Sequence, residues 1–285
     1  MRIRTLLWGF AGLLVLAVTV VLVNTYRLGR AHARLAADLV ADARALSAAE
    51  RDTEATFDPD DVEELPAPVR RYFETVLDEG QPHVRVARLE QDGEFRLGGA
   101  DAGWKPLEAT QHYTVDPPGF VWDATIDVAP LLPARVVDAY AHGEGYLRGK
   151  LLSTITVVDV GPDAKMNESE LVRYLAETPW FPTALLPAAG VEWEPIDDRS
   201  ARATLEHDGN EAFVVFHFDD GNLIERVTTE RYRQEDDDDA PWTGAFRGYE
   251  ERNGMLIPTD AEVAWDLPAG EVPYWRARIE AIDHR

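Results

Sequence analysis

An uninterrupted apolar run near the N-terminus constrains this chain more than any other feature. Residues Thr5 to Val23 (TLLWGFAGLLVLAVTVVLV) contain no charged side chain. A bilayer core is crossed by about 20 consecutive apolar residues in a helix. We therefore expect one N-terminal transmembrane helix that contacts the membrane through residues 5–23. With its flanks, this anchor takes up residues 1–27.

A cleavable signal peptide is the alternative interpretation of the same segment. Arg2 and Arg4 form a basic start, and residues 31–33 (Ala-His-Ala) have the small-x-small pattern of a cleavage site. The apolar run is long for a signal peptide, however, and the Ala-His-Ala lies beyond Arg27 and Arg30. A single-pass anchor in the cell membrane is therefore the favoured interpretation.

Charge does not decide on which side of the membrane the rest of the chain lies. Arg2 and Arg4 precede the span and Arg27, Arg30 and Arg34 follow it, so the positive charges nearly balance. Because no second span returns the chain, we expect the globular part to be extracytoplasmic. The chain has no cysteine, so no disulfide reports on the compartment.

The composition is strongly acidic. Asp and Glu number 52 against 28 basic residues, a formal net charge of −24, and the only lysines are Lys105, Lys150 and Lys165. This balance is typical of salt-loving archaea, because molar salt shortens the screening length to about 3 Å and relieves self-repulsion. An acidic protein from a GC-rich genome would look similar. Nucleic acid is not an expected partner, because phosphate binding needs basic patches.

Between the anchor and the globular domain, residues 28–56 predict a juxtamembrane helix and a linker. Leu35, Leu39, Ala43 and Leu46 share one helical face, and residues 52–61 (DTEATFDPDD) carry turn and charge signals. The remaining residues, 57–285, have the length of one β-rich domain.

The globular domain is predicted to be mainly β, of the α+β class. A short helix is expected in LPAPVRRYFETVL and a second one over Glu168 to Thr178. Elsewhere, alternating or β-branched segments predict about a dozen strands. The turn-forming dipeptides of tight hairpins are Asp92-Gly93, Asp208-Gly209, Asp220-Gly221 and Asn253-Gly254. We expect an antiparallel curved sheet or half-barrel with an inserted helix, a closed barrel or sandwich being the alternatives.

Recognised catalytic and cofactor motifs are missing. There is no Gly-x-Ser-x-Gly elbow, no glycine-rich phosphate loop before a helix and no HExxH. The pairs His142 with Glu144 and His217 with Asp219 are best interpreted as surface pairs. The acidic run 235–239 lacks the spacing of a calcium loop. We expect no metal and no cofactor.

Aromatic residues and one apolar loop are the more informative features. Seven tryptophans lie outside the span, and residues 180–187 (WFPTALLP) are apolar although loops are normally polar. The aromatics could form an ordinary core or line an apolar cavity of a curved sheet. The candidate lining is Trp122, Tyr140, Tyr174, Trp180, Phe181, Leu185, Leu186, Phe216 and Trp265.

Several segments together resemble an uncharacterised prokaryotic family described only as a domain of unknown function, often with N-terminal membrane spans. They are LPAPVRRYFETVL, GEFR, PPGFVWDATI, DAYAHGEGYL, LVRYLAETPWFPTALLP, PWTGAFRGYEERNGMLIP and VAWDLPAGEVPYW. With the acidic composition, the chain looks like a haloarchaeal-type member. The family has no established activity and implies no catalytic residues.

A second resemblance is architectural. A strand meander with an inserted helix, ending in a strand pair with Gly-x-x-x-Pro (residues 254–258), is similar to the lipoprotein-localisation factors (LolA-like proteins). Their half-barrel holds acyl chains on an apolar concave face. The resemblance implies a carrier of lipid or of another hydrophobic ligand, although a shared fold does not fix function.

Three functions follow as hypotheses. The leading one is a non-enzymatic, membrane-tethered domain that binds a lipid or other apolar ligand, with residues 168–187 as lid or plug. It requires apolar space inside the curved sheet. The second is an envelope-associated enzyme that uses carboxylates and a tyrosine, the candidates being Asp123, Asp138, Glu144 and Tyr140. The third is a scaffold that docks another membrane protein, whose identity the sequence does not indicate.

Overall fold

The computed structural model describes residues 2–49 and 55–285, with side chains from residues 8–45 and 55–285. Its first element is a single helix, α1 (Arg2–Ala49). Part of it, Trp8–Ala45, is long and apolar enough to cross a membrane, and none of its most apolar window is buried. The predicted span and juxtamembrane helix are thus one continuous helix. The side chains of Arg2, Arg4 and Leu46 and linker residues 52–54 lie outside the described parts.

Within these parts, the strands form one 13-stranded antiparallel sheet. They are β1 (Val86–Arg96), β2 (Trp104–Thr114), β3 (Gly119–Ala129), β4 (Leu132–Ala141), β5 (Glu144–Leu151), β6 (Ile155–Val160), β7 (Glu192–Asp197), β8 (Ser200–His207), β9 (Asn210–Phe218), β10 (Ile224–Arg233), β11 (Asp238–Arg252), β12 (Met255–Leu267) and β13 (Gly270–His284). The order is β6-β5-β4-β3-β2-β1-β13-β12-β11-β10-β9-β8-β7. Every neighbour is consecutive in the chain except β1 and β13, so two meanders are joined at the middle of the sheet.

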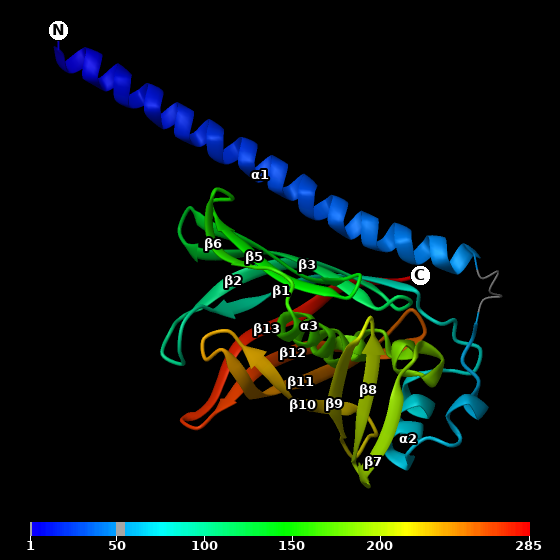
Figure 1. Cartoon of the computed structure of the whole chain (residues 1–285). Helices are drawn as coiled ribbons and strands as arrows, with labels where there is room; N and C mark the ends of the chain where they lie inside the picture. The colour runs from blue at the N-terminus through cyan, green and yellow to red at the C-terminus, as the bar shows by residue number, and fades with distance from the viewer. Residues whose placement is uncertain (1, 50–54) are drawn as a thin grey trace.

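The sheet curves into an open half-barrel around the inserted helix (Figure 1). Register shifts between Glu90 and Gln91 in β1 and between Val263 and Ala264 in β12 are bulges, which bend and twist a strand. The sequence prediction of a mainly β, antiparallel curved sheet with an inserted helix and an N-terminal apolar helix is confirmed.

Two local predictions were wrong. Asp92-Gly93 is not a hairpin turn, because β1 runs through it. Gly93 is needed there because a Cβ atom would lie 2.2 Å from the Arg276 carbonyl oxygen of β13. Residues 150–160 (KLLSTITVVDV) are one of the β-branched segments that predict a strand, but they contain the turn between β5 and β6, with positive φ angles at Leu152 and Ser153.

The connection between the edge strands β6 and β7 fills the concave side of the sheet. It contains α3 (Ala164–Glu177), which starts four residues earlier than predicted because the Asp163 side chain caps it, accepting from the Met166 N–H at 2.8 Å. Three 3-10 turns follow: η2 (Thr178–Trp180), η3 (Pro182–Leu185) and η4 (Pro187–Ala189). We call residues 178–189 the plug.

A second, smaller helical layer closes one end of the half-barrel. The turn η1 (Pro59–Val62) leads into α2 (Ala67–Val76), which has an apolar stripe of Val69, Tyr72, Phe73 and Val76. All four side chains are buried in the same core as the plug.

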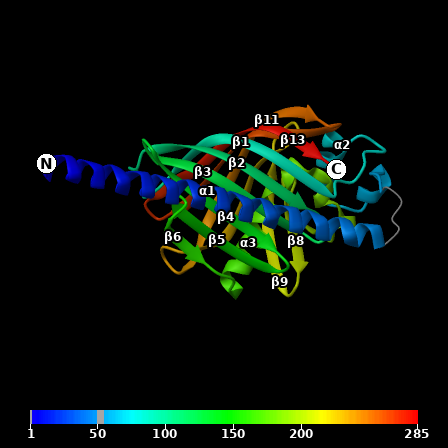
Figure 2. The same ribbon diagram turned by 90° about the horizontal axis from the view of Figure 1, so that it is seen from above.

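The C-terminal half of α1 packs on the convex face of the sheet, opposite α3. Figure 2 shows α1 lying across the outer surface of the strands that precede α3. The apolar contact joins Ala36 and Leu39 of α1 with Val121, Val137, Ala139 and Ala141 of β3 and β4. Beside it, His32 Nδ1 lies 2.8 Å from Asp123 Oδ1, and Arg135 donates to Asp123 Oδ2 at 2.6 Å. Burial alone would raise the pKa of Asp123, but these two partners lower it overall.

The two ends of the open sheet meet through two turns. Asn210 Nδ2 donates to the Gly143 carbonyl oxygen at 2.9 Å, and the Tyr140 hydroxyl lies 2.9 Å from His207 Nδ1. Gly143 has a φ of +76°, and a Cβ atom on it would lie 2.6 Å from the Cβ atom of Asp208. The β4–β5 and β8–β9 turns therefore approach closely enough to exclude any side chain at Gly143.

Gly143→Ala tests this closure. The variant has to adopt a left-handed conformation, at about 1–2 kcal/mol, and also has to push the two turns apart. Gly209→Ala is the matched control, because its φ is +79° and no atom lies within 4 Å of its added Cβ. We expect Gly143→Ala to lower the thermal unfolding midpoint of the full chain in detergent by several degrees more than the control. Equal midpoints would show that the turns do not meet.

Candidate functional site

The predicted ligand-lining residues all lie in or against the interior of the half-barrel. Eight are buried members of one core: Trp122, Tyr140, Tyr174, Trp180, Phe181, Leu185, Leu186 and Phe216. The ninth, Trp265, is half-buried and packs against that core, stacked on Tyr274 with ring centroids 5.8 Å apart. The residues are brought together, and their role in binding stays a prediction.

The plug occupies the apolar interior of the sheet. Phe181 packs between Tyr113 of β2, at a centroid distance of 4.6 Å, and Tyr174 of α3, at 5.9 Å. Trp180 meets Phe246 of β11 at 5.9 Å and Trp275 of β13 at 6.4 Å, both edge-on. The concave face that the binding hypothesis requires to be hollow is therefore covered by the chain's own side chains in this structure.

Few directional bonds hold the plug. Thr183 Oγ1 accepts from the Val84 N–H at 2.9 Å, Trp193 Nε1 donates to the Leu185 carbonyl at 2.9 Å, and His284 Nε2 lies 2.9 Å from the Trp180 carbonyl oxygen. The 3-10 turns have poorer hydrogen-bond geometry than an α-helix. Packing of large side chains thus supplies most of the binding of the plug to the sheet.

Two indole N–H groups at the plug lack an acceptor. Trp180 is 1% exposed and Trp275 is 7% exposed, and within the described side chains neither Nε1 atom has a hydrogen-bond partner. A buried donor without a partner costs about 1–3 kcal/mol. Packing of the plug against the sheet therefore buries apolar surface but leaves the two indole N–H groups without hydrogen-bond acceptors.

A buried polar network runs along one face of α3. Arg173 forms ion pairs with Asp138 of β4 and, at 2.9 Å, with Glu177 one turn further along. Glu177 Oε2 also accepts from the Tyr113 hydroxyl at 2.7 Å and from Gln111 Nε2 at 2.8 Å. The chain of hydrogen bonds continues from Gln111 through Gln91 to the Trp122 indole.

The second half of the network centres on Glu170, which is 2% exposed. Arg231 of β10 donates to Glu170 Oε1 at 2.8 Å. Burial, followed by the nearby charge of Asp138, raises the pKa of Glu170 to about 8. With Glu170 protonated, the charges of Arg173 and Arg231 are balanced by those of Asp138 and Glu177.

One shared proton removes the repulsion that two buried carboxylates, Asp138 and Glu170, would otherwise have. Asp138 Oδ1 and Glu170 Oε2 are both buried without a donor, and the two side chains are close enough to hydrogen bond. A proton on Glu170 lets it donate to Asp138, which satisfies both oxygens. Two carboxylates sharing one proton is the expected state of such a pair.

Sequence reasoning missed this network. Glu170, Arg173 and Glu177 have the spacing of the solvent-facing side of an amphipathic helix, yet α3 is enclosed by strands on both sides. A usable signal was present in residues 171–176 (LVRYLA), where five of the six residues are apolar and lie around the helix instead of on one stripe, as in a buried helix.

The residues of the enzyme hypothesis are not assembled into one site. Asp138 and Tyr140 share the inner face of β4, as predicted, but Tyr140 bonds to His207 and Asn210 and Asp138 bonds to Arg173. Asp123 lies on the convex face against α1, and Glu144 is exposed at the start of β5. Among the described side chains, no group of three His, Asp or Glu is arranged to hold a metal ion.

The fold and site define a half-barrel domain on a membrane-type helix, with its interior filled by an insert of its own. The chain belongs to the family of unknown function DUF6920, whose model matches residues 63–284. This confirms the resemblance to an uncharacterised family. A haloarchaeal origin stays a prediction.

Solved structures that match this chain include a LolA superfamily protein from Nitrosomonas europaea. It has a TM-score of 0.39 and 10% identity, over 76% of this chain and 92% of that one. A β-barrel-like protein of the domain of unknown function DUF1849 from Brucella abortus has a TM-score of 0.24 and 10% identity, over 71% of this chain and 99% of that one. A search of curated proteins gave no match. At this identity, neither structure assigns a ligand or an activity to this chain.

The shared proton predicts a specific pH dependence of stability. Glu titrates near 4.5 in the unfolded chain, while Glu170 in the folded protein titrates near 8. Between these values the unfolded state releases a proton that the folded state keeps, so this group lowers stability as pH rises from about 4.5 to about 8. Glu170→Gln keeps a donor toward Asp138 and removes the titration.

We expect the wild type to lose up to about 3 kcal/mol more stability than Glu170→Gln between about pH 5.5 and about pH 8. Chemical unfolding of the full chain in detergent measures this difference. Glu144→Gln, which removes an exposed carboxylate, controls for the general effect of charge. An unchanged pH dependence in Glu170→Gln would mean that Glu170 is already ionised in the folded protein.

Proposed function

We propose that this chain is a membrane-tethered domain that binds a lipid or similar amphiphile, without catalysis, on the concave face of its half-barrel. The binding domain is residues 57–285, and residues 1–27 anchor it in the cell membrane as a single span, with the domain outside the cytoplasm. In this structure the plug occupies the apolar space that binding requires, so the proposal also requires the plug to move out. The observation that supports it is the construction of the plug, which consists of short 3-10 turns held mainly by side-chain packing.

The size of the plug specifies the ligand. Its four large side chains, Trp180, Phe181, Leu185 and Leu186, are each at most 1% exposed. Burial of such a side chain is worth about 1.5–3 kcal/mol, and burial of one methylene about 0.8 kcal/mol. About 8–15 methylenes are therefore needed to replace the plug. A long acyl chain meets this requirement, whereas a small apolar metabolite does not.

The polar atoms of the interior favour an amphiphile over a pure hydrocarbon. The Trp275 indole N–H on β13 has no hydrogen-bond partner among the described side chains. It stays in the sheet when the plug leaves, so it can donate to an ester or carboxyl oxygen of the ligand. Arg173 of α3 and Arg231 of β10 are already paired with Glu177 and Glu170. A ligand with one acyl chain and an oxygen-rich head gives the Trp275 indole its acceptor.

The docking of α1 supports a role at the bilayer. Because α1 is one helix and packs on the sheet through Ala36 and Leu39, the domain is held at a fixed position relative to the span. A flexible linker would instead let it diffuse away from the membrane surface. An amphiphile that leaves or enters the bilayer would meet the domain at short range.

Native mass spectrometry of the full chain tests the proposal. After delipidation in detergent, the protein is incubated with a C16 fatty acid, with a C16 lysophospholipid or with a C6 fatty acid. We expect one C16 ligand bound per chain and no retained C6 fatty acid. Failure to retain either C16 ligand would contradict the proposal.

Two matched substitutions separate plug exchange from general loosening of the core. Phe181 in the plug and Phe73 in α2 are both fully buried in the same core, and truncating either to Ala costs about 3–5 kcal/mol. We expect Phe181→Ala to bind C16 ligand more tightly than the wild type, because the plug competes less well. Phe73→Ala should bind it as the wild type does. Equal gains in both variants would argue against a site at the plug.

A further inference from the structure

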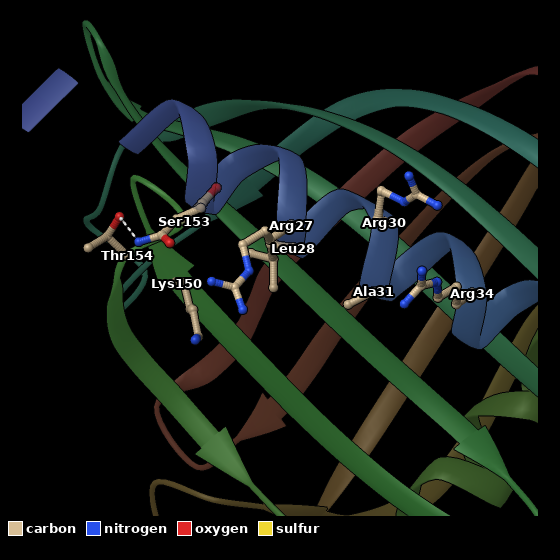
Figure 3. Close-up of a pocket in the computed structure, with 9 residues that line it drawn as sticks. Arg27, Leu28, Arg30, Ala31, Arg34, Lys150, Ser153 and Thr154 are labelled. Atoms are coloured by element: carbon tan, nitrogen blue, oxygen red, sulfur yellow. Dashed lines mark hydrogen bonds between the residues drawn. The ribbon is translucent and has the colours of Figure 1, made fainter. Parts of the chain in front are cut away.

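A pocket lies outside the half-barrel, where α1 passes the β5–β6 hairpin. Its volume is about 660 Å³. The charged residues that line it are Arg27, Arg30 and Arg34 of α1 and Lys150 of β5. Figure 3 shows Arg27 and Lys150 extending their charged ends into the same space. No acidic side chain lines this pocket, in a protein with a formal net charge of −24.

The pocket lies at the level where the span leaves the membrane. Asn24 directly follows the apolar run, and its Nδ2 donates to Thr154 Oγ1 of the β5–β6 turn at 3.2 Å. At 1.5 Å per residue, Arg27 lies about 6 Å beyond Val23. The headgroup layer on each side of the hydrocarbon core is about 5–8 Å thick. Arg27 is therefore at the depth of lipid phosphates, and the hairpin tip is beside it.

The cations of the pocket are largely without counter-ions. Arg30 donates to the Tyr26 hydroxyl at 2.9 Å. Among the described side chains, Arg27 and Arg34 of α1 and Lys150 of β5 form no ion pair, whereas most arginines of residues 57–285 do, for example Arg135 with Asp123 and Arg148 with Asp159. Cations held together without a carboxylate repel one another, and an anion in the pocket relieves that repulsion.

Exposed apolar side chains lie on the β3–β4 turn and on β6, next to the pocket. Leu131 in the β3–β4 turn is 96% exposed, and Ile155 and Val157 on β6 are 58% and 59% exposed. The Leu152 N–H donates to the Pro133 carbonyl oxygen at 2.8 Å, which holds the two turns side by side. Large apolar side chains beside a cationic pocket are the combination that favours a membrane interface.

We propose that this pocket binds the phosphate of an anionic phospholipid in the bilayer that α1 spans. Arg27 and Lys150 contact the phosphate, and Arg30 and Arg34 add positive charge further from the membrane. Leu131 and Ile155 enter the upper acyl region and orient the domain. This site is separate from the interior of the half-barrel: it rests on the membrane span of the proposed function and not on ligand binding in the interior.

The test uses the full chain in neutral detergent, with phosphatidylglycerol, phosphatidylcholine and inorganic phosphate as probes. Binding is followed by native mass spectrometry. Arg27→Gln/Lys150→Gln removes two cations, and Arg202→Gln/Arg252→Gln removes two surface cations on β8 and β11 as the matched control. Each cation near an anionic lipid surface is worth about 1 kcal/mol, so we expect the first variant to bind phosphatidylglycerol about 30-fold more weakly.

We expect the control variant to bind phosphatidylglycerol as the wild type does, and Arg27→Gln/Lys150→Gln to keep the wild-type binding of C16 lysophosphatidylcholine in the interior. The second result separates this site from the interior one. Equal binding of both lipids, or unchanged binding in Arg27→Gln/Lys150→Gln, would overturn the proposal. Inorganic phosphate bound as tightly as phosphatidylglycerol would also overturn it, because the site would then be one for a free anion.

Discussion

The structure depends on covering the concave face of an open sheet. Thirteen strands curve without closing, so an apolar inner face would meet water unless another element lay on it. The connection between the two edge strands, α3 and the plug, is that element. It carries Trp180 and Phe181 into the interior, and the turns at Gly143 and Asp208 bring the two ends of the sheet together around it.

The interior combines two kinds of surface that proteins usually keep apart. The plug is apolar and is seated mainly by packing, whereas the neighbouring face of α3 carries Glu170, Arg173 and Glu177 in a buried ion network. Breaking a buried ion pair leaves an uncompensated charge and is costly. The network therefore fixes the position of α3 through ion pairs, which the uncharged plug residues cannot form. A hinge near Thr178, where α3 ends and the 3-10 turns begin, would let the plug move while α3 stays.

The convex face carries the N-terminal helix. The helix α1 continues past its apolar segment and packs on β3 and β4 with small side chains at the contact, and the Asp123 carboxylate links His32 of the helix to Arg135 of the sheet. One helix thus sets the position of both the half-barrel and the basic pocket relative to the apolar segment. The inner and outer faces of β4 are used for different purposes, because alternate residues such as Asp138 and Ala139 point to opposite sides of the sheet.

The sequence by itself determined the local elements. The apolar run before Asn24, most of the period-two strands and the Asn253-Gly254 turn depend on nearest neighbours and on hydrophobic pattern, and these were predicted correctly. The properties that depend on long-range contacts were decided only by the tertiary structure. It showed that Gly93 serves a close approach to β13, that Glu170 is buried where its spacing indicated solvent, and that the interior is filled. The physical reason is that burial and pKa depend on which distant strands surround a residue, and no local pattern records that.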